Sequence, residues 1–481
     1  MLKSNIAWMK KNVPSDLKVW KGMIQDIDWS QVAAKTKLSL QRDKDRITAE
    51  FKEFAAMDTS AKIDWLMNGD RHLGYLYKKD AIAFARREWK GLKSVGYDFV
   101  GWLKIWGGML NMVMKDPMSI MLAVFEYHWF ASYLATPAVV DRSVFGRRGK
   151  LLQADFDMWV AITHWAEDLI ANLIMADAKI GGNQKINKRI IMFDEMTMAQ
   201  MMAGFPNLLG IPYQMIPVFM VSEMDQLTLI PYIDAIESYG LPSDTCPLPT
   251  AECGCAVKDE YPMCGQGFIA SSMPCDGSVM ATSFQDRRFS KFMPSYPLCM
   301  PVRYDDEDTT EMAAADMKDC IHWVEGLTGE TWNWDTYFAT MEKMNECTRL
   351  EMEKWEINKT HYPQLVGSSF ELFRKWNYEM DGGLFPEGLK TQRKICKTMM
   401  ETYEKKLPAY VGGYEKYRAL IWSCPAHFYA NFSNWLANCW GIYALTEMEA
   451  LNMTKMLNTT DKEEAINDLC RLYERMVMRR H

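Results

Sequence analysis

Apolar residues recur at intervals of three and four through the first part of the chain, up to about residue 188. This spacing places them on one face of a helix. It is clearest at Ile63, Leu66 and Met67, and at Trp159, Ile162, Trp165 and Leu169. The alternation of period two that marks half-buried strands is scarce here. Residues 1–188 are therefore predicted to form a helical extension.

Within this extension, residues Trp102–Val140 are rich in Trp, Met and Phe. Two interpretations fit such a run. It is a packed helical subdomain, or it is a surface that docks a partner subunit, because large exposed apolar patches usually mark interfaces. The packed subdomain is the favoured interpretation.

The pattern changes after the segment Gly181–Arg189. A short apolar run that ends in acids, Ile190–Glu195, is typical of a buried strand that leads into a loop. A helical segment, TLIPYIDAIESYG, follows, and then two more short apolar runs, GFIAS and PLCMPV. Alternating strand and helix signals predict α/β units with parallel strands.

The C-terminal part continues the alternation. Helices are expected over Trp334–Trp355 and Thr391–Lys406, a strand at RALIWS, and a helix over NFSNWLANCWG. A final helix has Thr460 or Asp461 as its N-cap candidate. One helical stripe is assigned to the core: Trp334, Phe338, Met341, Met352 and Trp355.

Composition narrows the class of protein. The chain has 481 residues, enough for two or three domains, and its net charge of −7 argues against general nucleic-acid binding. Residues Met196–Ser222 carry no charge, but five Gly and Pro residues would interrupt a spanning helix. We therefore expect a buried strand–turn–helix segment and no membrane span. The N-terminus has no apolar secretory core, so a cytoplasmic location with reduced thiols is predicted.

Five of the 12 cysteines fall within thirty residues: Cys246, Cys253, Cys255, Cys264 and Cys275. No C-x-x-C pair is present, so a zinc ribbon does not fit. Iron–sulfur ligation needs thiolates that converge in space rather than in sequence. On spacing alone, a metal site and ordinary buried thiols remain equally open.

The amino-acid sequences of three segments resemble those of a known protein family. PSDTCPLPTAECG (Pro242–Gly254) and MPCDGS (Met273–Ser278) resemble the first and second cluster-cysteine segments of the 2-hydroxyacyl-CoA dehydratase and benzoyl-CoA reductase family. The long segment that starts PLCMPVRYDDEDTTEMAAADMKDC resembles the entry to that family's second lobe. The three segments occur in the family's order, and the resemblance covers about residues 190–451.

The resemblance implies an α/β fold with two Rossmann-like or flavodoxin-like parallel-sheet lobes after the helical extension. The expected domains are residues 1–188, a first lobe at 189–297 with the cluster cysteines, and a second lobe at 298–481 with a helical insertion. It further implies that Cys246 and Cys275 are thiolate ligands of a four-iron four-sulfur cluster. The other three cysteines of the segment match no ligand position and are expected to be buried bystanders.

One departure concerns the third ligand. The family has a third cluster cysteine late in the second lobe, and this chain ends at His481 before that portion is expected. The second lobe is therefore expected to be incomplete. Cys424 is the best remaining candidate for a third ligand, although an ordinary buried loop thiol is the favoured interpretation.

The implied reaction is the elimination of water from a 2-hydroxyacyl-CoA under anaerobic conditions, through a ketyl radical formed by one-electron reduction. The implied partners are a homologous second subunit, an ATP-dependent activator protein as electron donor, and the acyl-CoA substrate. A benzoyl-CoA reductase subunit and a non-catalytic scaffold subunit remain alternatives. Asp276 and Ser278 are expected to cap the helix after Cys275, in preference to orienting the leaving hydroxyl.

Overall fold

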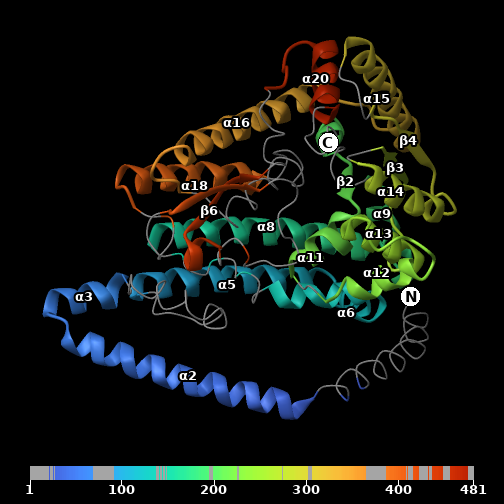
Figure 1. Ribbon diagram of the computed structural model, residues 1–481. Helices are drawn as coiled ribbons and strands as arrows, with labels where there is room; N and C mark the ends of the chain where they lie inside the picture. The colour runs from blue at the N-terminus through green and yellow to red at the C-terminus, as the bar shows by residue number, and fades with distance from the viewer. Residues whose placement is uncertain are drawn as a thin grey trace.

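The computed structural model describes residues 21, 25, 28–68, 91–136, 140, 144, 147, 149–193, 199–224, 227–272, 275–301, 306–364, 386–407, 409, 415–421, 432, 436–447 and 456–474. Most of these residues are helical, and the strands form two separate parallel sheets (Figure 1). No helix within the described ranges is long and apolar enough to cross a membrane.

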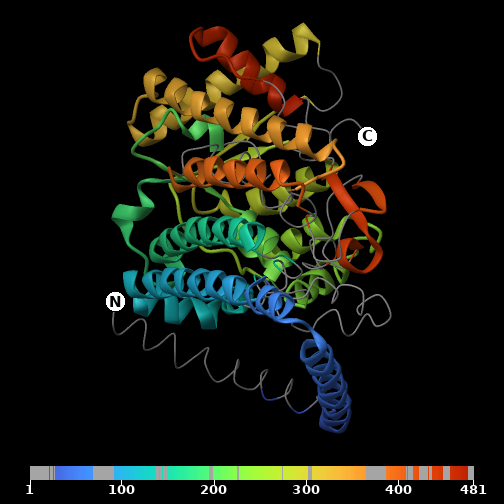
Figure 2. The ribbon, with the colours of Figure 1, turned by 90° about the vertical axis from the view of Figure 1, so that its left-hand side faces the viewer.

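The N-terminal part is helical, as the sequence predicts. Its main helices are α2 (Trp29–Ala56), α3 (Thr59–Asn68), α5 (Leu92–Lys115), α6 (Pro117–Glu126) and α8 (Gly149–Ala176). Helix α5 packs along α8, and α2 runs below them and apart from the body in both ribbon views (Figures 1 and 2). The predicted stripe on α8 is buried: Trp159, Ile162, Trp165 and Leu169 are at most 7% exposed.

The larger sheet has the order β2–β1–β3–β4, with every neighbouring pair parallel. Its strands are β1 (Ile190–Phe193), β2 (Leu209–Pro212), β3 (Gly267–Ser271) and β4 (Ser295–Leu298). The register pairs Ile190 with Leu209 and Ile191 with Gly267. All four residues of β1 are buried, as expected for a strand covered on both faces.

Successive side chains of this sheet enter two different hydrophobic cores. Ile190, Met192 and Phe268 join a core that includes α5, α8 and α13 (Pro247–Val257). Ile191 and Ile269 join a second core built with α15 (Glu307–Thr328), α16 (Trp334–Asn358) and α20 (Lys462–Glu474). The sheet therefore forms the wall between the helical extension and the later helices.

The remaining described helices connect or cover these strands: α9 (Gln184–Asn187), α10 (Ala199–Met202), α11 (Met220–Met224), α12 (Ile230–Glu237), α14 (Asp276–Phe289) and α18 (Pro386–Glu404). The second sheet pairs β5 (Tyr417–Ile421) with β6 (Ile442–Glu447) in parallel. Most of β5 is exposed or half-buried, unlike β1.

A buried carboxylate joins the helical extension to the large sheet. Asp177, which directly follows α8, accepts hydrogen bonds from the Tyr127 hydroxyl and, at 2.7 Å, from the Met263 backbone N–H. Burial raises the pKa of Asp177, and these hydrogen bonds oppose the shift. The connection holds the end of α8 against the turn that precedes β3.

Most sequence predictions of local structure are confirmed. Strands β1, β3 and β5 lie where apolar runs predicted them, and the described part of Met196–Ser222, residues 199–222, forms short helical segments around β2 rather than a span. Asp461 is the residue that caps α20, because its carboxylate accepts the Glu464 N–H at 2.8 Å. The presence of parallel sheets confirms an α/β protein, although helices dominate.

Two predictions need correction. Met352 was assigned to the core stripe of α16, but its side chain is 43% exposed. The buried face of α16 instead includes the ion pair of Glu351 and Lys354, so hydrophobicity alone misplaced the face. The sequence did not predict strand β6. The described residues just before it, Leu436–Trp440, form a single π-helical turn, whereas a longer helix was expected over NFSNWLANCWG.

Candidate functional site

Cys246 and Cys275 occupy equivalent places in the fold. Each is the N-cap residue of a helix, Cys246 of α13 and Cys275 of α14. The Cys246 carbonyl accepts the Thr250 N–H at 3.2 Å, and the Cys275 carbonyl accepts the Val279 N–H at 3.0 Å. Both backbones therefore turn into a helix immediately after the cysteine, which leaves the thiols at helix ends. Cys246 is exposed and Cys275 is half-buried.

The first turns of these two helices touch. A Cβ placed on Gly277 would lie 3.0 Å from Pro249 Cγ and 3.7 Å from the Cys275 thiol sulfur. Pro249 is three residues beyond Cys246 in α13, and Gly277 is two residues beyond Cys275 in α14. The fold thus brings together the two helix ends that carry the predicted ligands, although 28 residues separate them in sequence.

The two helix ends differ in the N–H groups they offer. Pro247 and Pro249 lack an N–H, so the first turn of α13 has few donors. Asp276, Gly277 and Ser278 give α14 a first turn without proline. Backbone N–H groups and partial positive charge at a helix N-terminus attract anionic ligands, so α14 offers more to a bound anion than α13 does. The Asp276 carboxylate in the same turn opposes this effect in part.

The prediction that Asp276 and Ser278 cap α14 is wrong. Cys275 holds the N-cap position, and Asp276 and Ser278 lie inside the first turn. The Ser278 hydroxyl lies 3.6 Å from the Cys275 sulfur, and the serine is only 6% exposed. The hydroxyl is therefore a hydrogen-bonding partner of the thiol. The spacing C-x-x-S at a helix start was the available signal, since residues three apart share a helix face.

The other three cysteines of the segment are buried, as expected. Cys253, Cys255 and Cys264 are at most 1% exposed. Burial raises the pKa of Cys253 to about 12 and raises the pKa of Cys255 and Cys264 well above the ordinary thiol range. These thiols stay protonated at neutral pH and behave as small core residues. The ten cysteines whose side chains the structure describes are free of disulfides.

The described residues do not bring a third ligand to the site. No group of three or more His, Cys, Asp or Glu side chains suited to a metal ion occurs among them. Cys424, the third candidate, lies outside the described residues. Cys299, which sequence reasoning did not single out, is exposed directly after β4, and its N–H donates to Asp316 at 2.7 Å. Among the described residues, Cys246 and Cys275 are thus the two predicted ligands whose helix starts lie in contact.

Comparison with known families decides the relationship. The family model for the 2-hydroxyglutaryl-CoA dehydratase D-component matches residues 226–480, which include Cys246, Cys275 and both of their helices. The chain belongs to this family. Members of the D-component family are dehydratase subunits and typically carry iron–sulfur clusters. A search of curated proteins found no match to the chain.

Proposed function

We propose that this D-component family member is the iron–sulfur subunit of a 2-hydroxyacyl-CoA dehydratase, with Cys246 and Cys275 as two cluster ligands. The contact between the first turns of α13 and α14 is the observation that supports this best. Family membership supports the reaction class, the elimination of water from a 2-hydroxyacyl-CoA. A homologous second subunit and an ATP-dependent activator complete the proposed system.

A bound four-iron four-sulfur cluster would supply a low-potential electron and an iron with an open coordination position. Two groups of this chain would support such a cluster at Cys275. The first turn of α14 offers backbone N–H groups next to Cys275, and the Ser278 hydroxyl is 3.6 Å from the sulfur of that cysteine. A hydrogen bond to a ligating sulfur stabilises negative charge there, and so raises the reduction potential of the group it binds.

Two other functions remain within the same family resemblance. A benzoyl-CoA reductase subunit would use the same two cysteines, and turnover with a reduced activator on an aromatic or a 2-hydroxyacyl thioester separates the two reactions. A non-catalytic scaffold subunit would assemble without any cluster. Cys246 is exposed and Cys275 is half-buried, whereas a thiol with a purely structural role is usually buried. This favours the two functions that need a cluster over the scaffold.

The test is metal analysis of protein prepared without oxygen. The wild-type chain should be brown and contain iron and acid-labile sulfide, and the Cys246→Ser and Cys275→Ser variants should lose most of both. Cys299→Ser is the matched control, because Cys299 is also exposed and directly follows a strand. A colourless wild-type protein after iron and sulfide reconstitution would rule out the proposal, as would full iron content in both variants.

A further inference from the structure

Helix α5 has two apolar faces, and only one of them is covered. Gly101, Ile105 and Gly108 are buried against α8. A second stripe consists of Leu92, Val95, Phe99, Leu103, Trp106 and Leu110, which are 43–63% exposed. At about 100° per residue, the stripe lies nearly opposite the buried face. Its spacing of three and four residues is that of a helix that packs along another helix.

Helix α2 carries a sparser apolar stripe, whose members lie 11, 7 and 4 residues apart. Trp29, Leu40, Ile47 and Phe51 are 55–73% exposed and lie within a narrow sector of the helix. Phe54 continues this sector at the end of α2. A 28-residue helix with its large apolar side chains in water is poorly stabilised by its own sequence. Both stripes therefore need a partner surface.

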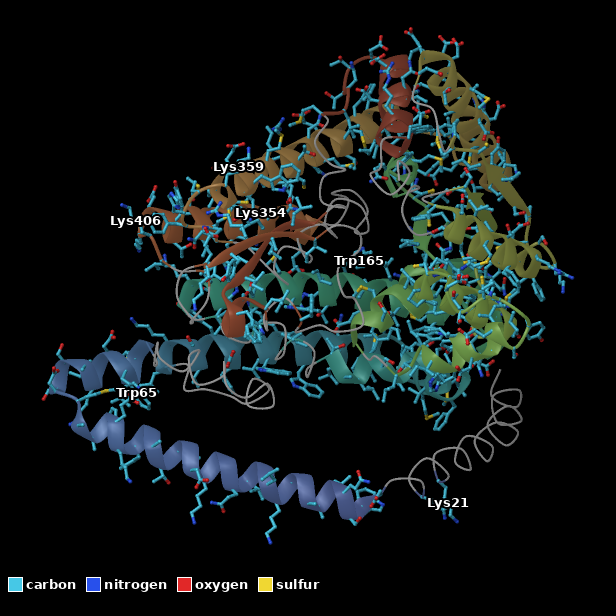
Figure 3. The ribbon with its side chains drawn as sticks, in the orientation of Figure 1. Lys21, Trp65, Trp165, Lys354, Lys359 and Lys406 are labelled. Atoms are coloured by element: carbon cyan, nitrogen blue, oxygen red, sulfur yellow. The ribbon has the colours of Figure 1, made fainter. Side chains whose placement is uncertain are left out.

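The corner between α2 and α3 is firmly built, so α2 does not lie on its own α5. The Phe54 and Trp65 rings are 4.9 Å apart, and the Lys62 ammonium lies 6.0 Å from the Phe54 ring. Asp58 accepts the Ala61 N–H at 2.8 Å and caps the start of α3. Figure 3 shows Trp65 at this corner, from which α2 departs beneath α5.

We infer that the α2 stripe of one copy packs on the α5 stripe of a second copy, in a two-fold exchange that makes a homodimer. The lengths agree: the α5 stripe spans about 27 Å and the α2 stripe about 33 Å at 1.5 Å per residue. Each stripe exposes on the order of 500 Å² of apolar side chain, so each copy contributes about 1,000 Å², where a stable interface needs about 800 Å² per partner. In a dimer with a two-fold axis, each copy contributes its α2 stripe to one contact and its α5 stripe to the other.

This dimer does not depend on the proposed function, because the residues that form it are remote in sequence from α13 and α14. In this dimer, the exposed side of the Trp102–Val140 segment contacts a second copy. The opposite side of α5 belongs to the packed subdomain that the sequence favoured. The interpretations as packed core and as docking surface thus apply to opposite faces of one helix.

Light scattering during gel filtration tests the dimer. The wild-type chain should have twice its mass of 55.7 kDa, and the variants Ile47→Glu on α2 and Trp106→Glu on α5 should each raise the dimer dissociation constant at least about a hundredfold. Leu227→Glu is the control, because Leu227 is 69% exposed and lies outside both stripes. Circular dichroism should show unchanged helix content in Leu227→Glu and, in the two stripe variants, a loss no larger than the 28 residues of α2, which would show that the rest of the chain stays folded.

Mixing the two variants tests which stripes meet. A mixture of Ile47→Glu and Trp106→Glu chains keeps one intact α2–α5 contact per dimer, so dimerisation should be partly restored. No restoration would show that like stripes pair with each other and would overturn the exchange. A monomeric wild-type chain, dimers unaffected by both variants, or association only with a homologous subunit would each overturn the proposal.

Discussion

Helices α13 and α5 are both held by close packing at glycines, yet they present different surfaces. Helix α13 is buried along most of its length, where Cys253 and Cys255 lie, and shows only the end that carries Cys246. Helix α5 is covered on one side only and shows a long apolar stripe. The end of α13 offers a thiol fixed at a helix start, which suits chemistry, whereas the side of α5 offers area, which suits association.

The largest expected contrast is in thiol reactivity along α13. At pH 8, a thiol with a pKa of about 12 has a thiolate fraction on the order of 10⁻⁴, so in protein without a bound cluster Cys253 should be alkylated about a thousandfold more slowly than Cys246. Mass spectrometry of peptides after timed alkylation measures both rates. Labelling in denaturant is the control, where the rates should converge. Equal rates in the native protein would show that α13 is not covered along its body.

The next contrast concerns the glycine contacts. A Cβ at Gly254 of α13 would lie 1.9 Å from the Tyr232 carbonyl oxygen, a backbone atom that cannot move aside. We expect Gly254→Ala to lower the free energy of unfolding by about 3 kcal/mol. The matched change in α5 is Gly108→Ala, where the nearest atoms belong to the side chains of Glu167 and His164 rather than to the backbone, so the loss should be smaller, about 1–2 kcal/mol. Urea unfolding of both variants measures the difference, and equal losses would contradict it.

The α5–α8 contact should also respond to pH. Burial raises the pKa of Glu167 to about 8, from an ordinary value of 4.5. The folded state then binds a proton that the unfolded state releases, so stability should fall as pH rises from about 4.5 to about 8, by at most about 1.4 kcal/mol per pH unit. Glu167→Gln should flatten this slope in urea titrations, and Asp168→Asn should reduce it only in part, because the Asp168 charge adds to the shift that burial causes. An unchanged slope in Glu167→Gln would assign the effect to other groups.

The smallest expected effect is a gain in stability. Gly107, on an exposed part of α5, would place a Cβ with no atom within 4 Å. Gly107→Ala should therefore raise the free energy of unfolding by about 0.5–1 kcal/mol, because alanine loses less backbone freedom in a helix. Thermal unfolding followed by circular dichroism checks the sign. A loss would show that this side of α5 is more crowded than the outer stripe implies.

Strands β1 and β3 could be predicted from the sequence because their apolar runs are buried on both faces and lie between clear turn signals. The buried face of α16 could not, because it contains Glu351 and Lys354, which pair inside the protein. Apolar spacing detects a face only where burial and hydrophobicity coincide. Strand β6 was not predicted because the expected helix runs up to it: a π-helical turn ends at Trp440, and a single glycine in the left-handed conformation, Gly441, separates this turn from the strand.

For the candidate site, the spacing of the five cysteines did not distinguish ligands from ordinary thiols. The resemblance to the family's sequence segments is what singled out Cys246 and Cys275. The structure adds what no spacing rule contains, which is that Gly277 and Pro249 bring the two helix starts into contact. It also moves Ser278 from an expected cap to a partner of the Cys275 sulfur. Such contacts depend on how β3 and its helices stack, so they are encoded over a long stretch of chain rather than in a local motif.

The Asp177 carboxylate has a consequence for chimeric proteins. It receives hydrogen bonds from Tyr127 in the helical extension and from the Met263 N–H ahead of β3. A helical extension transplanted from a relative would have to bring an acceptor for that N–H, because a buried donor without one costs about 1–3 kcal/mol. Exchanging the extension and the sheet together should be tolerated far better than exchanging either alone, and the two are expected to be inherited as a unit.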